Sequence, residues 1–368
     1  MLQSPLAAPM PALPSVAPDL ALLMQPLLPQ IQTNKDLQVV LEMKSVKMLT
    51  FCSKNKSEHY TKLTIPKHDG TLRTLYNPDA QMRAAQYRIL TKLLNNLNLP
   101  DYVYAFERNK NIPSMAAKHV GKHCIISLDI KDFFHSIKQH TVFNIMQRLG
   151  LGDFPARTVS ELCTYKAFVP QGALTSPKIS NLVTSVTFGP EIQDYCREHQ
   201  LVLTIYADDV VVSSDNKEID PKEIIQDLTR IITSHGFRIN KKKTKVMFHG
   251  SRQYVCGAVV NAKVNLIVKE RKRLRAIIHN ITKNGIEVEA VKSNKEPAQF
   301  LNYVRGRVNW FRQLNSVMGK QYFDKLKAYL ETVKAAALEE ANLALLYKHY
   351  MEEAEKIILD GGEISVPW

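Results

Sequence analysis

Between positions 201 and 214 the sequence reads LVLTIYADDVVVSS. Two apolar runs, 201–206 and 210–214, flank the short segment 207–209, which carries Asp208 and Asp209. Apolar runs of this length around a tight turn predict the two strands of a β-hairpin. A solvated turn rarely needs two buried flanking strands, so we expect a rigid sheet to present both carboxylates in a cleft.

A third carboxylate, Asp129, ends the apolar run 123–128, which predicts another buried strand. A neighbouring strand could bring Asp129 alongside the other two acids. Like charges about 4 Å apart repel by about 4 kcal/mol per pair at an effective dielectric of about 20, so the cluster needs a cation, a shared proton or basic partners. Hard divalent cations prefer such oxygen ligands, and two of them can activate a hydroxyl and stabilise leaving pyrophosphate. An isolated Asp-Asp pair could equally be a polar turn.

The composition favours a nucleic-acid partner. The 368 residues include 49 Lys and Arg against 35 Asp and Glu, a formal net charge of +14, and 45% are hydrophobic. An excess of this size favours a polyanion, although a merely basic globular protein would show it too. No apolar run reaches the roughly 18 residues of a membrane span, and no basic segment precedes the N-terminal apolar residues. The five cysteines fit neither a zinc site nor a disulfide framework, so we expect a cytoplasmic protein with reduced thiols and no membrane partner.

Periodicity predicts the remaining elements. Residues 1–35 carry seven prolines and predict a loose arm, with a short helix near 20–24 and order beginning near residue 36. The predicted strands are 59–65 and 71–76 (a hairpin), 245–249, 253–260 and 264–268. The predicted helices begin at Asn77-Pro78, at Thr141 (to Leu149), at Ser176-Pro177 (interrupted at Gly189-Pro190) and at Asp220 (to Gly236), and helices fill 269–359.

Three segments together resemble the reverse transcriptases. They are LDIKDFFHSI at 128–137, PQGALTSP at 170–177 and YADD at 206–209, in that order. The resemblance implies an α+β right-hand polymerase fold, with fingers and palm built from an antiparallel sheet plus helices and with an α-helical thumb. The expected divisions are a Pro-rich arm (1–35), the N-terminal region and fingers (36–126), the palm (127–260) and the thumb and tail (261–368). The reverse transcriptase domain would span about 46–260, with the helix at 141–165 in the fingers.

The resemblance also assigns the metal site. Asp129 and Asp208 would ligate two Mg²⁺ ions, for which Mn²⁺ could substitute, and Asp209 would support them. Ile130 belongs to the same expected metal set. Lys243 matches a lysine that can protonate the leaving pyrophosphate, although the whole run 241–245 could simply bind phosphate.

Five residues are expected to bind the incoming nucleotide by the same resemblance. Phe134 matches an aromatic steric gate that collides with a ribose 2′-OH; the alternative is core packing. Gln171 and Gly172 would contact nucleotide and template. Arg73 and Lys67 would clamp the triphosphate, although Lys67 could be a solvated turn residue.

Within the family the chain most resembles the bacterial retron enzymes. The segments YVCG at 254–257, MAAKHVGK at 115–122 and YVRGRVNW at 303–310 carry this likeness, with Met115 and Cys256 departing from the family pattern. His119 could also be a packed core histidine, and Trp310 is expected to pack between thumb helices. The residues predicted to bind nucleic acid are His119, Lys241, Lys242, Lys245, Val255, Cys256, Gly257, Arg271, Lys272, Arg273, Arg305 and Arg307.

A retron enzyme is expected to copy part of its own structured non-coding RNA into single-stranded DNA. Priming from a guanosine 2′-OH would give a branched RNA–DNA, and dNTPs are the expected substrates. No nuclease domain is expected after the thumb, so a host RNase H would degrade the copied RNA. An effector protein from the same locus would serve phage defence. The alternatives are an abortive-infection or group II intron-like reverse transcriptase, and a silent RNA-binding scaffold, which the presence of all three acids disfavours.

Overall fold

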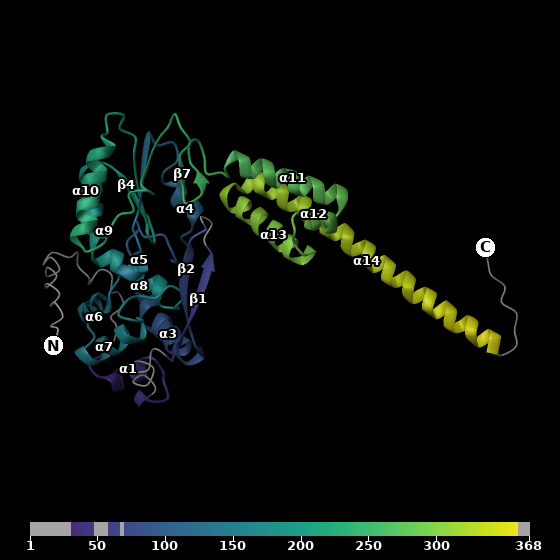
Figure 1. Ribbon diagram of the computed structural model, residues 1–368, viewed down its shortest axis with the longest axis horizontal. Coiled ribbons are helices and arrows are strands. Elements are labelled where there is room, and N and C mark those ends of the chain that lie inside the picture. The colour runs from purple at the N-terminus through teal and green to yellow at the C-terminus, as the bar shows by residue number, and fades with distance from the viewer. Residues whose placement is uncertain (1–30, 48–57, 67–69, 360–368) are drawn as a thin grey trace. The chain divides into compact units, whose positions relative to one another are not determined.

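The computed structural model describes residues 31–47, 58–66 and 70–359. The chain divides into two compact units, Met1–Lys263 and Val264–Trp368. The first is mixed helix and sheet and the second is helical (Figure 1). Within the described residues, no helix is both long and apolar enough to cross a membrane. The predicted helix near 20–24 lies outside this part of the chain, whereas Ile31 is buried, so packed structure begins before residue 36.

A four-stranded antiparallel sheet forms the centre of the first unit. Its strands are β3 (Cys124–Asp129), β4 (Val202–Tyr206), β5 (Asp209–Ser214) and β6 (Lys245–Phe248), in the order β4-β5-β3-β6. The predicted hairpin and the predicted strand before Asp129 are therefore confirmed. Ile126, Leu128, Val210 and Val212 are buried on one face, as period-2 alternation requires.

Helices cover both faces of this sheet (Figure 1). On one side lie α8 (Ser176–Val186), α9 (Phe188–Glu198) and α10 (Pro221–Ser234), whose apolar residues share one core cluster with the sheet. On the other side lies α4 (Ile112–Ala117), which packs against the small hairpin of β7 (Tyr254–Val255) and β8 (Ala258–Val259). The helix break falls at Thr187 rather than at the predicted Gly189-Pro190, because proline is tolerated in the first turn of α9.

A second hairpin and several helices complete the unit. They are β1 (Tyr60–Pro66), β2 (Leu72–Pro78), α1 (Asn34–Val40), α3 (Ala80–Lys92), η2 (Leu94–Asn96), α5 (Phe133–Ser136), α6 (Gln139–Arg148) and α7 (Asp153–Leu162). The predicted helix start at Asn77-Pro78 is wrong by two residues, because β2 runs through Pro78 and Asp79 caps α3 by accepting from Met82 N. The predicted cap Thr141 lies inside α6, which begins after Lys138.

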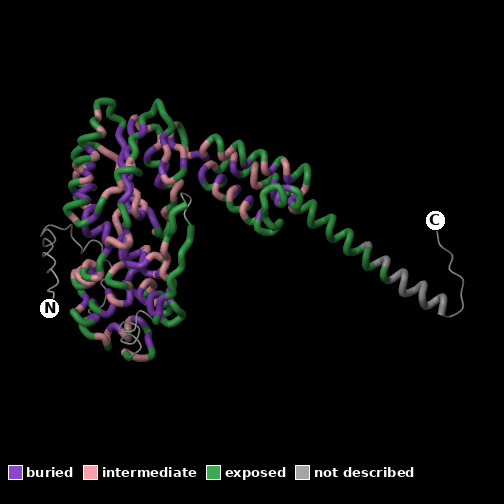
Figure 2. The backbone as a smooth tube through the Cα atoms, in the orientation of Figure 1, coloured by how far each residue is buried: buried purple, intermediate pink, exposed green. Residues whose placement is uncertain are grey.

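The second unit is built from α11 (Val268–Asn284), α12 (Ile286–Lys292), α13 (Pro297–Leu314) and α14 (Ser316–Leu359). The predicted strand 264–268 is wrong, since Val268 already opens α11. Leu274, Val304 and Phe311 are buried between these helices, and Trp310 is half-buried, in agreement with packing. Helix α14 is exposed beyond this bundle over 331–342 (Figure 2).

Candidate active site

The loop of the β4–β5 hairpin carries Asp208. Tyr206 pairs with Asp209, so the loop has only two residues, and Ala207 has a φ of +54°. A positive φ at the first loop residue alone is the pattern of a type II′ turn, whose twist matches that of the flanking strands. Asp208 is fixed further by its carbonyl, which accepts from Ile130 N at 2.8 Å. The tight turn therefore holds Asp208 against the end of β3.

Asp129 ends β3 directly opposite Asp209. Its carboxylate accepts from Lys243 Nζ at 2.8 Å, and its backbone carbonyl accepts from Asn240 N at 2.8 Å. Lys131 N donates to Arg238 O at 2.7 Å, so two backbone bonds fasten the segment before Lys243 to the segment after β3. The ammonium of Lys243 is thereby held among the three acids.

The electrostatics of this cluster show an excess of negative charge. Burial, followed by the repulsion of Asp208 and Asp129, raises the pKa of Asp209 to about 6. Burial and then Asp129 likewise raise the pKa of Asp208. The hydrogen bond to Asp129 raises the pKa of Lys243, so this side chain is a cation at neutral pH. The site therefore favours positive charge.

These residues fit a divalent cation. Over the described part of the chain, no three His, Cys, Asp or Glu side chains stand in a ready-made ligand cluster. The donors at the strand ends are nevertheless all carboxylate oxygens, which Mg²⁺ prefers over nitrogen or sulfur. The ammonium of Lys243 occupies an oxygen of Asp129 as a stand-in cation. Because these carboxylates already pair with a positively charged lysine side chain, they are suited to bind the expected Mg²⁺ ions.

A cavity of about 1240 Å³ opens over the carboxylates. Its lining includes Arg73 from β2, Phe134 from α5 and Gln171, three of the residues predicted to bind nucleotide. Arg73 is exposed, whereas the Phe134 ring is half-buried with its centroid 5.8 Å from that of the buried Phe133. Three predicted nucleotide residues are thus brought together with all three acids. Lys67 lies outside the described residues.

Gly172 occupies a position that excludes larger residues. Its φ is +111°, and a Cβ there would lie 2.8 Å from Tyr76 O. The neighbouring Gln171 carbonyl accepts from Tyr76 N at 2.7 Å. These contacts join the segment 170–177 to β2, so Gln171 and Arg73 face the same cavity.

Sequence reasoning missed several residues of the cavity wall. They are Thr71, Leu72, Thr74, Tyr76, Phe106, Lys131, Asp132, Ser136, Lys138, Arg238 and Asn240. Phe106 is the one aromatic side chain among them that is exposed, at 51% exposure. The only available signal was an aromatic residue in the irregular segment before α4, which carries no periodicity.

The predicted contact of His119 with nucleic acid is wrong. The side chain is fully buried beneath the sheet, with Nδ1 2.7 Å from Ser213 Oγ and Nε2 2.7 Å from Thr204 Oγ1. A neutral imidazole can donate to one hydroxyl and accept from the other. Burial lowers the pKa of His119 to about 4, which keeps it neutral. His119 therefore fastens the turn after α4 to β4 and β5.

We expect His119 to make the protein acid-sensitive. The unfolded histidine titrates near pH 6.5 and the folded one near 4, so the unfolded state binds the extra proton between these values. The free energy of unfolding should fall by up to about 3 kcal/mol as the pH falls through this window. In urea titrations at pH 7 and pH 4.5, His119→Leu should be less stable at pH 7 and show a smaller loss on acidification.

The exposed His249 provides the matched control, since His249→Leu should keep the wild-type pH response. A His119→Leu protein with unchanged stability but weakened RNA binding would contradict the structural role.

The segment 254–257 forms a hairpin turn rather than part of one long strand. Cys256 and Gly257 have φ values of +46° and +85°, the pattern of a type I′ turn between β7 and β8. Val255, predicted to bind nucleic acid, is buried, so its side chain does not face a nucleic-acid partner. Cys256 Sγ lies 4.0 Å from Met115 Sδ and 3.9 Å from Asp209 Oδ2, which places this turn beside the carboxylates.

The remaining predicted nucleic-acid residues lie on the surface of both units. Lys241, Lys242 and Lys245 are exposed in the first, with Lys245 Nζ 4.8 Å from the Tyr254 ring centroid. In the second unit Lys272, Arg273 and Arg305 are exposed, Arg271 is half-buried, and Arg307 pairs with Glu270. All five of these second-unit residues lie on α11 or α13, and three of their side chains face solvent.

Comparison with known proteins agrees with this geometry. A family profile described as "Reverse transcriptase (RNA-dependent DNA polymerase)" matches residues 65–303. The retron Ec86 reverse transcriptase of Escherichia coli is 30% identical over 70% of this chain and 81% of its own length. The chain belongs to the retron reverse transcriptases. This retron reverse transcriptase is also 31% identical to the retron Mx65 enzyme of Myxococcus xanthus, over 75% of this chain and 69% of the relative.

The fold and the enzyme class follow from this membership. The retron reverse transcriptase is an RNA-directed DNA polymerase with the right-hand polymerase fold, so both expectations are confirmed. Among solved structures, telomerase from Candida albicans in complex with a fragment of telomeric RNA is similar over 73% of this chain and 59% of that one. The identity is 10% and the TM-score 0.42.

Proposed function

We propose that this enzyme copies part of a cognate structured non-coding RNA into single-stranded DNA by two-metal nucleotidyl transfer. The observation that carries the proposal is the set of three carboxylates, Asp129, Asp208 and Asp209, at the floor of a cavity of about 1240 Å³. An in-line displacement at phosphorus requires dense positive charge where negative charge develops, and the anionic floor is suited to hold it.

The metal-binding residues would be Asp129 and Asp208, with Ile130 beside them and Asp209 supporting. Two bound Mg²⁺ ions supply charge for the attacking hydroxyl and the leaving pyrophosphate. Asp209 faces Asp129 across β5 and β3, and its pKa is raised by burial first and then by the repulsion of the two neighbouring acids. Mn²⁺ is expected to substitute, because it accepts the same oxygen ligands.

Lys243 is positioned to neutralise or protonate pyrophosphate. Its Nζ lies at the carboxylates and its side chain is 60% exposed, so it can turn toward a substrate in the cavity. The raised pKa keeps a proton available at neutral pH. Lys241, Lys242 and Lys245 supply further exposed positive charge along the same segment for phosphate contacts.

The nucleotide would lie between β2 and α5. Arg73 presents a guanidinium, which can bind a phosphate through two N–H groups. Gln171 and the tight approach of Gly172 to Tyr76 shape the wall beneath the base and template. Phe134, packed on Phe133, would exclude a 2′-OH and so select dNTPs.

The template and primer are proposed to be the cognate RNA itself, primed from a guanosine 2′-OH to give a branched RNA–DNA. A host RNase H would remove the copied RNA, and an effector protein from the same locus would act with the enzyme in phage defence. The exposed Lys272, Arg273 and Arg305, with the half-buried Arg271 and Arg307, would bind the RNA backbone in a salt-dependent manner.

The test is to express the enzyme with the non-coding RNA of its own locus and to sequence the nucleic acid that co-purifies. A branched RNA–DNA, absent from the Asp208→Asn variant, supports the proposal. Bound RNA without DNA, unchanged by that substitution, would show an RNA-binding scaffold. DNA of untemplated sequence would indicate chemistry of the abortive-infection type instead.

A further inference from the structure

An aromatic side chain that the proposed chemistry does not use stands in the wall of the active-site cavity. Phe106 is 51% exposed and lines the cavity together with Tyr206, and the two ring centroids are 6.3 Å apart. Burial of a large apolar side chain lowers the free energy of the protein. A ring exposed in a polar cavity therefore indicates that a ligand packs against it. A nucleobase or a sugar offers a flat apolar surface of matching size.

The backbone of Phe106 is strained. Its φ is +59°, in the left-handed region that bulky residues rarely adopt. Such a conformation persists only where the surroundings hold it, and it is concentrated at binding and catalytic sites. Because the side chain of this strained residue is exposed, the strain does not serve packing of the core. We infer that it orients the ring for binding.

Two backbone hydrogen bonds align the Phe106 loop with the catalytic hairpin. Tyr104 N donates to Ile205 O at 2.9 Å, and Ile205 N donates to Tyr102 O at 2.7 Å. Ile205 immediately precedes Tyr206 in β4. The segment 102–104 therefore pairs with the free edge of β4. This pairing fixes the position of Phe106 relative to the catalytic hairpin.

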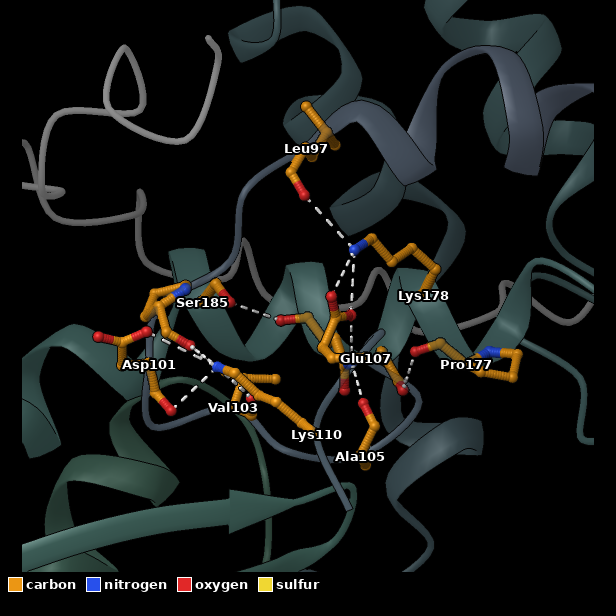
Figure 3. A network of polar contacts seen from close by, with 12 residues as sticks. Leu97, Asp101, Val103, Ala105, Glu107, Lys110, Pro177, Lys178 and Ser185 are labelled. Carbon is orange, nitrogen blue, oxygen red and sulfur yellow. Dashed lines mark hydrogen bonds and ion pairs between the residues drawn. The ribbon is translucent and has the colours of Figure 1, made fainter. Parts of the chain in front are cut away.

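A buried polar network holds both neighbours of Phe106 (Figure 3). Lys178 Nζ on α8 donates to the Glu107 carboxylate at 2.9 and 3.0 Å, and both side chains are largely buried. Asn181 Nδ2, one turn along α8, donates to Ala105 O and to Glu107 Oε1. Lys110 Nζ donates to the carbonyls of Pro100, Asp101 and Val103. An ion pair buried in this way fixes one geometry, because breaking it leaves a charge without a partner.

We propose that Phe106 and Tyr206 form a stacking platform for the nucleotide that donates the attacking hydroxyl, the terminal nucleotide of the primer. This inference rests on the proposed polymerase function. In the sheet order β4-β5-β3, Tyr206 ends β4, with β5 between it and Asp129 at the end of β3, and Phe134 follows β3 in α5. With the incoming nucleotide on the Phe134 side, the second substrate lies on the Phe106 side. Neither ring carries a charge, so the platform accepts any base.

Steady-state kinetics on an RNA template annealed to a DNA primer test this. Phe106→Ala should raise KM for the primed template about tenfold, the loss of one stacked base, and leave KM for dNTP within about twofold. Phe106→Tyr keeps the ring and should behave as wild type. The control Phe154→Ala removes a ring that is 72% exposed on α7, outside the cavity, and should change neither KM.

Glu107→Gln tests the supporting network. It should raise KM for the primed template in the same direction as Phe106→Ala and lower the melting temperature, whereas Phe106→Ala should leave the melting temperature unchanged. If the wild-type enzyme is active but Phe106→Ala leaves KM for the primed template unchanged, the proposed platform is wrong. The same holds if Phe106→Ala raises KM for dNTP instead. A wild-type enzyme unable to extend the primer would instead refute the proposed function itself.

Discussion

Replacing Asp208 by asparagine is expected to lower DNA synthesis at least about 1000-fold, which corresponds to about 4 kcal/mol of transition-state stabilisation. Asparagine keeps the size of the side chain and one oxygen but removes the charge that would hold the cations. The type II′ turn and the hydrogen bond from Ile130 N to Asp208 O involve only backbone atoms, so the hairpin is preserved. The loss should therefore fall on kcat rather than on folding.

Stability provides the second measurement for this substitution. Burial and the neighbouring acid raise the pKa of Asp208, which means that the ionised side chain is disfavoured in the folded protein. The melting temperature of Asp208→Asn without Mg²⁺ should therefore equal or exceed that of the wild type. Added Mg²⁺ should raise the melting temperature of the wild type more than that of the variant, because a ligand stabilises only the state that binds it.

Asp215→Asn is the matched control, since Asp215 is exposed just beyond the opposite end of β5 and pairs with Lys122. It should keep full activity and the full response to Mg²⁺. A loss of synthesis in Asp208→Asn far smaller than the expected one, or an equal Mg²⁺ response in Asp208→Asn and Asp215→Asn, would contradict the assignment of Asp208 as a metal ligand.

The hairpin and its acids could be predicted from the sequence because local patterns determine them. The apolar runs on both sides of 207–209 predict two strands joined by a tight turn, which is what the structure contains. The register that sets Asp129 opposite Asp209 follows once β3 pairs with β5. The bond between Lys243 and Asp129 spans 114 positions and depends on two backbone bonds after β3, so no local pattern contains it.

The errors at His119 and Val255 have a common cause. His119 lies two residues after the end of α4 and Val255 lies in β7, and both segments are too short to show a periodicity that distinguishes the buried face from the exposed one. His119 is buried because Ser213 and Thr204, from two other strands, satisfy both of its ring nitrogens. Phe106 was overlooked for a different reason, since its exposure results from a loop whose shape depends on the bond between the neighbouring Glu107 and Lys178, which lies far along the chain.

The second large effect is expected at Phe134, where alanine should lower the preference for dNTPs over rNTPs about 100-fold. The ring stands over the cavity because Phe133, which is buried, packs against it with centroids 5.8 Å apart. The 2′-OH of an rNTP would collide with this fixed ring. A group of this size changes the discrimination between two substrates by about 10- to 200-fold. The measurement is the ratio of kcat/KM for dGTP to that for GTP on one primed template.

Two further variants separate a gate from ordinary packing at Phe134. Phe134→Tyr retains the ring and should retain the selectivity, whereas Phe133→Leu should lower the melting temperature through a loss of buried contact and leave the selectivity nearly unchanged. If Phe134→Ala instead lost stability and kept its preference for dGTP, the ring would belong to the core. The cavity wall would then have to discriminate sugars elsewhere, and Tyr76 on β2 would be the next aromatic side chain to replace.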